Sequence, residues 1–204
     1  EGLMGKIIGI TGGIASGKST VTTYLRQQGF QVVDADAVVH KQQKPGGRLY
    51  QVLVQHFGQE IILENGELNR PLLASLIFSN PEEREWSKQT QGEIIREELA
   101  ALRDQLAQTE AIFFMDIPLL FEQDYASWFD ETWLVYVDHD IQLERFMKRD
   151  QLSKEVAESR LATQWSLEEK KKLASHILDN NGSRDQLVSQ VVKLLEGGDG
   201  CARD

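Results

Sequence analysis

The sequence predicts an α/β fold in which five strands form a doubly wound parallel sheet, with an inserted helical subdomain and a helical lid. Short apolar runs alternate with helical patterns along the chain, and a glycine-rich turn joins the first run to the first helix. The chain of 204 residues is long enough to bury one full core and to carry insertions. We therefore expect one domain at residues 6–196 and a flexible, glycine-rich tail at residues 197–204.

The glycine-rich turn at residues 12–19 matches the phosphate-binding pattern G-x-x-x-x-G-K-[ST] at every fixed position. A buried-strand pattern at residues 7–10 precedes it, and a helical pattern with Val21, Tyr24 and Leu25 on one face follows it. Glycines suit this place because the backbone must turn sharply and present its N–H groups to phosphate oxygens. The N-terminus of the following helix adds partial positive charge. The turn is therefore predicted to hold a triphosphate, and the alternative is a glycine turn with a solvated lysine.

Two side chains of this phosphate loop have specific expected roles. The Lys18 ammonium is expected to reach the β- and γ-phosphates of ATP, and the Ser19 hydroxyl is expected to bind Mg²⁺. The residues predicted to bind ATP are Gly12, Gly13, Ala15, Ser16, Gly17, Lys18, Ser19 and Thr20.

An apolar stretch at residues 30–33 predicts the second strand, and Asp34 and Asp36 follow it. Residues two apart in an extended chain point to the same side, and ligands of open α/β sheets bind beyond the carboxyl ends of the strands. We therefore expect both carboxylates to face the phosphate loop. Asp36 is assigned the role of orienting the acceptor hydroxyl and taking its proton, and Asp34 the role of serving the metal through water. The reverse assignment stays open, and a helix cap is the alternative for either residue.

Residues 41–108 are predicted to form an inserted helical subdomain, because helical patterns follow one another there without a clear strand. A long helix with a capping signal is expected after Asn80. Trp86 lies on this helix and is interpreted as a core residue, with a ligand platform as the alternative. The residues of this helix that are expected to face inward are Ile95, Leu99, Leu102 and Leu106.

Three further apolar runs predict the remaining strands, at residues 111–116, 132–137 and 177–179. Asp116 stands at the carboxyl end of the first of these runs, where it is expected either to serve the metal through water or to cap the strand end. The core of the domain is therefore expected at residues 6–40, 109–144 and 173–196.

Residues 145–172 hold eight basic residues against five acidic ones, in a chain whose formal net charge is −10. Capping serines divide the stretch into short helices, as a basic lid over a triphosphate requires. Arg145 and Arg149 lie four residues apart on one helix face, and planar, bidentate guanidinium groups suit a transferring phosphoryl group. For the lysine run at residues 170–172, the favoured interpretation is ordinary solvated helix charge.

The net charge of −10 argues against a general affinity for nucleic acid or for an anionic membrane. A single cysteine, Cys201, excludes an intramolecular disulfide, and the four histidines show no metal-ligand spacing. The longest apolar runs are too short to span a bilayer. We therefore expect a cytoplasmic protein without a nucleic-acid or membrane partner, present as a monomer or a weak homo-oligomer.

The ordered set of motifs resembles the dephospho-CoA kinases, which transfer the γ-phosphoryl group of ATP to the ribose 3′-hydroxyl of dephospho-CoA in the last step of coenzyme A synthesis. The matching stretches are residues 9–20, 34–36, 65–70, 118–122, 145–150 and 177–183. They run in family order over nearly the whole chain. The resemblance implies a nucleotide-kinase-like fold with core, helical substrate subdomain and lid. It also implies ATP and dephospho-CoA as substrates, Mg²⁺ with the ATP, and Asp36, His40 and Arg70 at the acceptor.

The chain departs from the family pattern at two places. It has Gln91–Gly92 where the family usually has His-Pro, and Ser175 where the family often has Asp, so family contacts at these positions do not transfer.

Two other functions stay open from the residues alone. One is a different small-molecule kinase with the same loop, acting on a nucleoside or nucleotide. The other is a nucleotide switch of the GTPase type. Against the switch, the chain lacks the Asn-Lys-x-Asp guanine-reading motif, and its basic lid supplies transition-state charge within the same chain.

Overall fold

A computed structural model describes residues 5–197 of the chain, which divides into two compact units. The first unit comprises the chain up to Val33 and from Leu106 onward, and the second comprises Asp34–Gln105. The division into core, insertion at about 41–108 and lid at 145–172 is a functional one and stays a prediction. Of the tail expected at 197–204, residues 198–204 lie outside the described residues.

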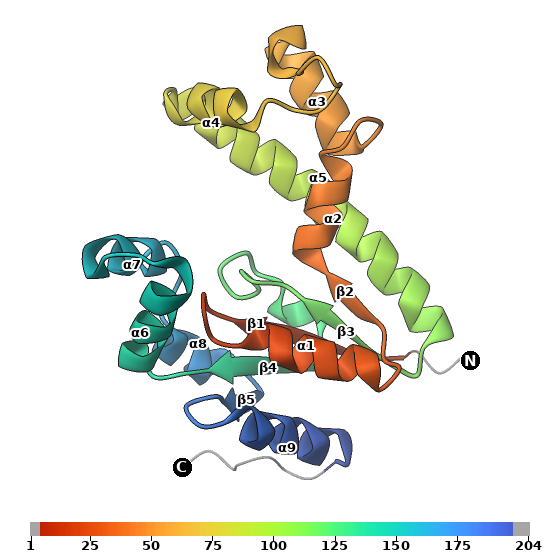
Figure 1. The fold of residues 1–204 in the computed structure, drawn as a ribbon. Helices are drawn as coiled ribbons and strands as arrows, with labels where there is room; N and C mark the ends of the chain where they lie inside the picture. The colour runs from red at the N-terminus through yellow and green to blue at the C-terminus, as the bar shows by residue number, and fades with distance from the viewer. Residues whose placement is uncertain (1–4, 198–204) are drawn as a thin grey trace. The chain divides into compact units, whose positions relative to one another are not determined.

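The expected parallel sheet of five strands is confirmed in the part of the chain that the structure describes (Figure 1). The strands are β1 (Lys6–Gly12), β2 (Val32–Asp34), β3 (Ile112–Asp116), β4 (Glu131–Tyr136) and β5 (His176–Asp179). Their spatial order is β2, β3, β1, β4, β5. Central β1 pairs in parallel with β3 on one side and β4 on the other. Because the strands are parallel, their carboxyl ends meet at one edge of the sheet, and the phosphate loop begins at that edge.

Strand β1 is apolar on both faces, as a central strand of a covered parallel sheet requires. Its residues from Ile7 to Gly12 are all buried. A Cβ at Gly9 would lie 2.7 Å from a ring carbon of Phe129 and 2.8 Å from a methyl carbon of Leu120. Glycine at this position therefore allows both side chains to pack directly against the strand.

The helices of the first unit are α1 (Lys18–Gln27), α6 (His139–Asp150), α7 (Lys154–Leu161), α8 (Leu167–Leu173) and α9 (Arg184–Leu195), with a short 3₁₀ helix, η2 (Ala126–Trp128). Helices α1 and α9 lie side by side against the sheet (Figure 1). The expected inward face of α1 is confirmed for Val21 and Leu25, which are fully buried in the core between helices and sheet, whereas Tyr24 is half-buried against that core. This packing fixes the N-terminus of α1 at the end of β1.

The helices of the second unit are α2 (Ala35–Gln42), α3 (Arg48–Phe57), α4 (Arg70–Phe78) and most of α5 (Pro81–Thr109), with a 3₁₀ helix, η1 (Gln59–Ile61). The buried residues of its own core are Leu53, Ile61, Leu68 and Leu73. Trp86 packs against this core and stacks on His56, with ring centroids 3.6 Å apart. The interpretation of Trp86 as a core residue agrees with this packing.

The inward face expected for α5 is partly wrong. Leu99 is buried as expected, whereas Ile95 is only half-buried and its neighbour Ile94 is buried in its place. Ile94 and Ile95 are adjacent and equally apolar, so the hydrophobic pattern does not show which of them is buried. Tertiary packing determines this. Leu102 and Leu106 are half-buried.

Candidate functional site

The phosphate loop turns from β1 into α1 through a backbone that favours glycine. Gly17 occupies the N-cap position of α1 with φ of 89°, in the left-handed region. Within residues 5–197, no side chain caps the first turn of α1. The first N–H groups of a helix have no partner inside the helix, and its N-terminus carries partial positive charge. The turn therefore offers backbone donors and positive charge to an anion.

Three side chains from distant parts of the first unit hold carbonyl groups of the phosphate loop. They come from α8, from α6 and from the turn after β5. The contacts are Lys170 Nζ to Gly12 O (3.3 Å), Gln142 Nε2 to Ile14 O (2.8 Å) and Asn180 Nδ2 to Ser16 O (2.7 Å). We call these three side chains the carbonyl donors.

The carbonyl donors set the direction of the loop's amides. In a trans peptide, the carbonyl of one residue and the N–H of the next point in opposite directions, and the described backbone has no cis peptide. The N–H groups of Gly13, Ala15 and Gly17 are therefore directed away from the carbonyl donors. Each of these alternate amides thus faces away from the side chain that holds the preceding carbonyl, which leaves it available to phosphate oxygens.

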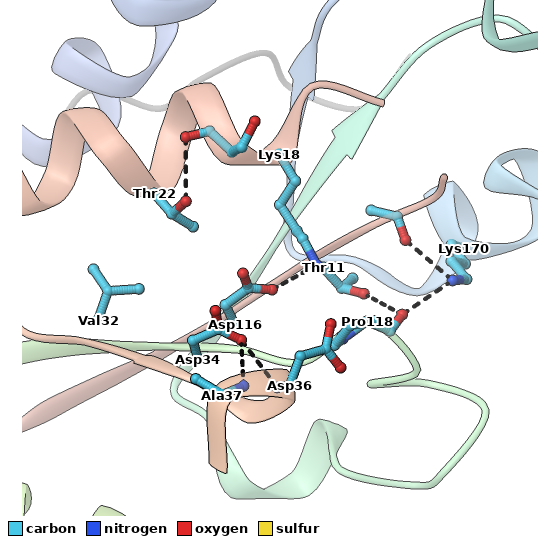
Figure 2. A network of polar contacts seen from close by, with 12 residues as sticks. Thr11, Lys18, Thr22, Val32, Asp34, Asp36, Ala37, Asp116, Pro118 and Lys170 are labelled. Carbon is cyan, nitrogen blue, oxygen red and sulfur yellow. Dashed lines mark hydrogen bonds and ion pairs between the residues drawn. The ribbon is translucent and has the colours of Figure 1, made fainter. Parts of the chain in front are cut away.

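Lys18 makes an ion pair with Asp116 at the end of the neighbouring strand β3. Lys18 Nζ lies 2.6 Å from Asp116 Oδ1 (Figure 2). The register of β1 with β3 places Asp116 beside Ile10, two residues before the loop begins. Asp116 therefore stands at the expected strand end, and its role toward a metal stays a prediction.

Ser16 contributes a buried hydroxyl to the loop. The residue is 1% exposed, and its Oγ has no hydrogen-bond partner among the described residues. A buried polar atom without a partner is uncommon in proteins and calls for an explanation. A phosphate oxygen is an acceptor that such a hydroxyl fits.

Arg145 and Arg149 do not share a partner, although they lie on one helix. Arg145 donates from Nη1 to Asn180 O at 2.7 Å, and Asn180 is one of the carbonyl donors. Arg149 pairs with Asp150, with Nε 2.8 Å from Oδ1, and its guanidinium lies over the Phe146 ring. The hydrogen bond from Arg149 holds the pKa of the Asp150 carboxyl below its ordinary value. Of the two arginines, Arg145 is therefore the one that hydrogen bonds link to the phosphate loop, through Asn180.

In the second unit, Asp34 caps helix α2. Its Oδ1 accepts from Asp36 N at 2.9 Å and from Ala37 N at 3.2 Å (Figure 2). The extended-chain argument that both carboxylates share one side is wrong, because β2 ends at Asp34 and Asp36 already lies in the first turn of α2. That the two carboxylates face the phosphate loop stays a prediction. The Asp34 cap uses only Oδ1, and the Asp36 side chain is exposed.

His40 of α2 and Arg70 of α4 lie together within the second unit. Arg70 Nη2 is 3.5 Å from His40 Nδ1, and Arg70 Nη1 donates to Gln43 Oε1 at 2.6 Å. These side chains come from two helices, so the sequence alone could not place them beside each other. A guanidinium beside an imidazole offers several donors to an anionic ligand.

The interpretation of the whole lysine run as solvated charge is wrong for Lys170. This residue is fully buried, whereas Lys171 and Lys172 are exposed. The other two carbonyl donors, Gln142 and Asn180, were also missed as site residues. Asn180 had one signal in the sequence, because it follows a predicted strand at the carboxyl edge of the sheet.

Helix α8 is anchored to the sheet through Tyr136 of β4. The Tyr136 hydroxyl lies between the carboxylates of Asp138 and Glu168, and it is 3.0 Å from Asp138 Oδ1. Lys171 Nζ lies over the same ring, 4.5 Å from its centroid. Burial, together with hydrogen bonds to Glu168 and Asp138, raises the pKa of the Tyr136 hydroxyl well above its ordinary value. The end of the predicted lid is therefore held on the core.

The described residues contain no group of three or more His, Cys, Asp or Glu side chains that could hold a metal ion. Between residues 5 and 197, no helix is both long enough and apolar enough to cross a membrane.

Comparisons with known proteins identify relatives of this chain. The family model described as dephospho-CoA kinase matches residues 6–186. A dephospho-CoA kinase of Streptococcus pneumoniae serotype 4 is 81% identical over 201 residues, which cover 98% of this chain and 100% of that protein. A crystal structure from Thermus thermophilus is 33% identical, with a TM-score of 0.77 over 95% of this chain and 98% of that chain. A dephospho-CoA kinase from Campylobacter jejuni is 28% identical, with a TM-score of 0.72 over 95% of this chain and 99% of that chain.

The raised pKa of Tyr136 predicts a specific loss of stability in alkali. The unfolded chain releases this proton near pH 10, whereas the folded protein keeps it to higher pH. The stabilisation is complete below pH 10 and is lost as the pH rises through the folded-state pKa. We expect the free energy of unfolding of Tyr136→Phe to fall less steeply than that of the wild type between about pH 9 and pH 11. Urea unfolding over this range measures how the free energy of unfolding changes with pH in each protein. Equal slopes would contradict a raised pKa of Tyr136.

Proposed function

The chain belongs to the dephospho-CoA kinase family, and we propose that it catalyses the ATP-dependent phosphorylation of the ribose 3′-hydroxyl of dephospho-CoA to give coenzyme A. It is a kinase, a phosphotransferase with an alcohol group as acceptor, and it uses ATP. The observation that carries the proposal is the phosphate loop, whose carbonyls are held by the three carbonyl donors, in a chain that matches this family over nearly its whole length.

We assign the β- and γ-phosphates of ATP to the phosphate loop. The N–H groups of the loop and of the start of α1 bind the phosphate oxygens, with the Ser16 hydroxyl as a further donor. Lys18 exchanges its partner Asp116 for the phosphates and stabilises the charge that develops in the transition state. Preorganised donors of this kind need little reorganisation during the reaction, which is why they contribute strongly to the rate.

We propose that Mg²⁺ accompanies the ATP. The chemistry of the available donors fits this ion, because the exposed Ser19 hydroxyl and the carboxylates of Asp34 and Asp116 are hard oxygen ligands. Ser19 is assigned to direct coordination, and Asp34 to contact through water. When bound, the ion neutralises charge on the phosphates during transfer.

We assign the acceptor to the second unit. Asp36 orients the acceptor hydroxyl and takes its proton, and because phosphoryl transfer has a loose transition state, positioning is its larger contribution. His40 and Arg70 bind the anionic part of dephospho-CoA, which carries a pyrophosphate. Their proximity within the second unit supports this pairing.

We assign Arg145 and Arg149 to the transferring phosphoryl group. Arg145 is held beside the phosphate loop through Asn180, which supports a role at the phosphates. Arg149 pairs with Asp150 through Nε, so its contribution requires at least a rotation of its exposed side chain toward the phosphoryl group. We further propose that the protein is cytoplasmic, that it is a monomer or a weak homo-oligomer, and that it has no nucleic-acid partner.

The acceptor distinguishes this proposal from that of another small-molecule kinase. ADP release should be rapid with ATP and dephospho-CoA, and slow with ATP and a panel of nucleosides and nucleoside monophosphates. Mass analysis should find one added phosphoryl group on dephospho-CoA. Phosphorylation of a nucleoside alone would refute the proposed acceptor.

Removal of the Lys18 charge should slow phosphoryl transfer with little effect on the fold. Lys18→Met keeps the aliphatic stem but loses the ammonium that acts on the β- and γ-phosphates. We expect turnover to fall by about a hundredfold or more. Steady-state kinetics measures the loss, and a circular dichroism spectrum checks the fold. Turnover close to that of the wild type would remove Lys18 from the mechanism.

Two asparagine variants separate the roles of the acidic pair. Asp36→Asn keeps the shape but cannot take the proton, so turnover should fall while ATP affinity stays unchanged. Asp34→Asn should instead raise the Mg²⁺ concentration needed for half-maximal activity. Turnover measured against Mg²⁺, with ATP binding measured separately, tests both. A normally active Asp36→Asn would reverse the assignment if Asp34→Asn were strongly impaired and its residual activity had an unchanged Mg²⁺ response.

A further inference from the structure

Lys170 of α8 is the charged member of the carbonyl donors, and it has no exposed surface. Burial of an ammonium group is costly unless it is paired and fully hydrogen-bonded. Its Nζ lies 3.1 Å from Glu122 Oε2, 3.3 Å from Gly12 O and 3.4 Å from Pro118 O. One carboxylate and two main-chain carbonyls thus surround the buried cation.

The partners of Lys170 belong to the two segments that build the phosphate site. Gly12 is the last residue of β1 and begins the loop, and Pro118 follows β3 two residues after Asp116. Thr11 Oγ1 donates to the same Pro118 carbonyl at 3.0 Å (Figure 2). Lys170 therefore joins the start of the loop to the segment that carries the partner of Lys18.

Glu122 links this cation to the predicted lid. Its Oε2 also accepts from Trp165 N at 3.3 Å, in the connection between α7 and α8. This carboxylate, whose side chain is 11% exposed, thereby joins Lys170, the segment after β3 and the segment before α8. A purely local role in helix α8 would need none of these contacts.

The charge of Lys170 also acts on the site. The pKa of its ammonium lies below the ordinary value, chiefly because of burial; the nearby Lys18 ammonium lowers it further, and the Glu122 carboxylate opposes the shift. Two cations thus lie close enough to interact at the phosphate loop, each with its own carboxylate partner. A bound triphosphate would be attracted by both.

We propose that Lys170 is a positioning residue for phosphoryl transfer, which holds the carbonyls of Gly12 and Pro118 so that the Gly13 N–H and Lys18 stay directed at the nucleotide phosphates. Glu122 keeps the Lys170 ammonium in place. Lys170 does not touch the substrate, since it is fully buried behind the loop backbone. The inference rests on the proposed binding of ATP at this loop.

The test compares Lys170→Met, the double variant Lys170→Met/Glu122→Gln and the control Lys193→Met. The double variant removes both charges, so it leaves no unpaired buried carboxylate and stays informative if the single variant fails to fold. Lys193 is an exposed lysine of α9 and controls for the loss of one positive charge from the same unit. The measurements are kcat, the KM for each substrate, and the Kd of ADP by calorimetry.

For the double variant, we expect the KM for ATP and the Kd for ADP to rise by about tenfold or more, because small displacements of positioning groups have large effects. The KM for dephospho-CoA should stay within about twofold of the wild type, because its binding residues lie in the other unit. Lys193→Met should match the wild type in all values.

A folded double variant with wild-type KM for ATP and wild-type Kd for ADP would overturn the inference, whatever its melting temperature. Equal rises in both KM values would also overturn it, since they would indicate a general structural defect. Failure of the proposed function would look different, because the wild type itself would then neither bind ADP nor phosphorylate dephospho-CoA.

Discussion

A phosphate loop must present its N–H groups to an anion while its carbonyl groups find other partners. In this protein, three side chains meet that constraint by donating to alternate carbonyls of the loop. The planar trans peptide then aims the intervening amides in the opposite direction. The sheet contributes as well, because the carboxyl ends of its parallel strands meet at one edge. The loop that follows β1 and Asn180, which follows β5, therefore lie at that edge. The direction of the loop amides therefore depends on side chains that the loop sequence does not contain.

The sequence predicts those parts of this arrangement that are encoded locally. The loop pattern, the apolar runs of the strands and the inward face of α1 each depend on residues close together in the chain, and the structure agrees with them. The carbonyl donors stand 128, 158 and 164 residues from the carbonyls that they bind, so no local pattern reports them. The burial of Lys170 is also hard to predict because the two lysines beside it are exposed, so the run resembles a solvated helix face. Asp34 and Asp36 were placed on one side because a strand three residues long gives no signal of its end.

The anchoring of α8 changes how the predicted lid is understood. Its last helix is tied to β4 through Tyr136 and to the loop through Lys170, so it forms part of the wall of the phosphate site. Helix α7, in contrast, packs chiefly against α6 around Phe146 and Ala157. Charge alone could not separate these segments, because each carries basic residues beside two glutamates. What separates them is burial, which only the tertiary structure determines.

The central claim is that this loop holds the β- and γ-phosphates of the nucleotide. Calorimetric titration of the wild-type protein with ATP, ADP, AMP and adenosine tests the claim most directly, because it needs no acceptor and no variant. Hydrogen bonds to charged groups contribute roughly 1.5–3 kcal/mol each, and the β-phosphate adds at least two of them. ATP and ADP should therefore bind about a hundredfold or more tightly than AMP. Equal affinities for ADP and AMP would contradict the account.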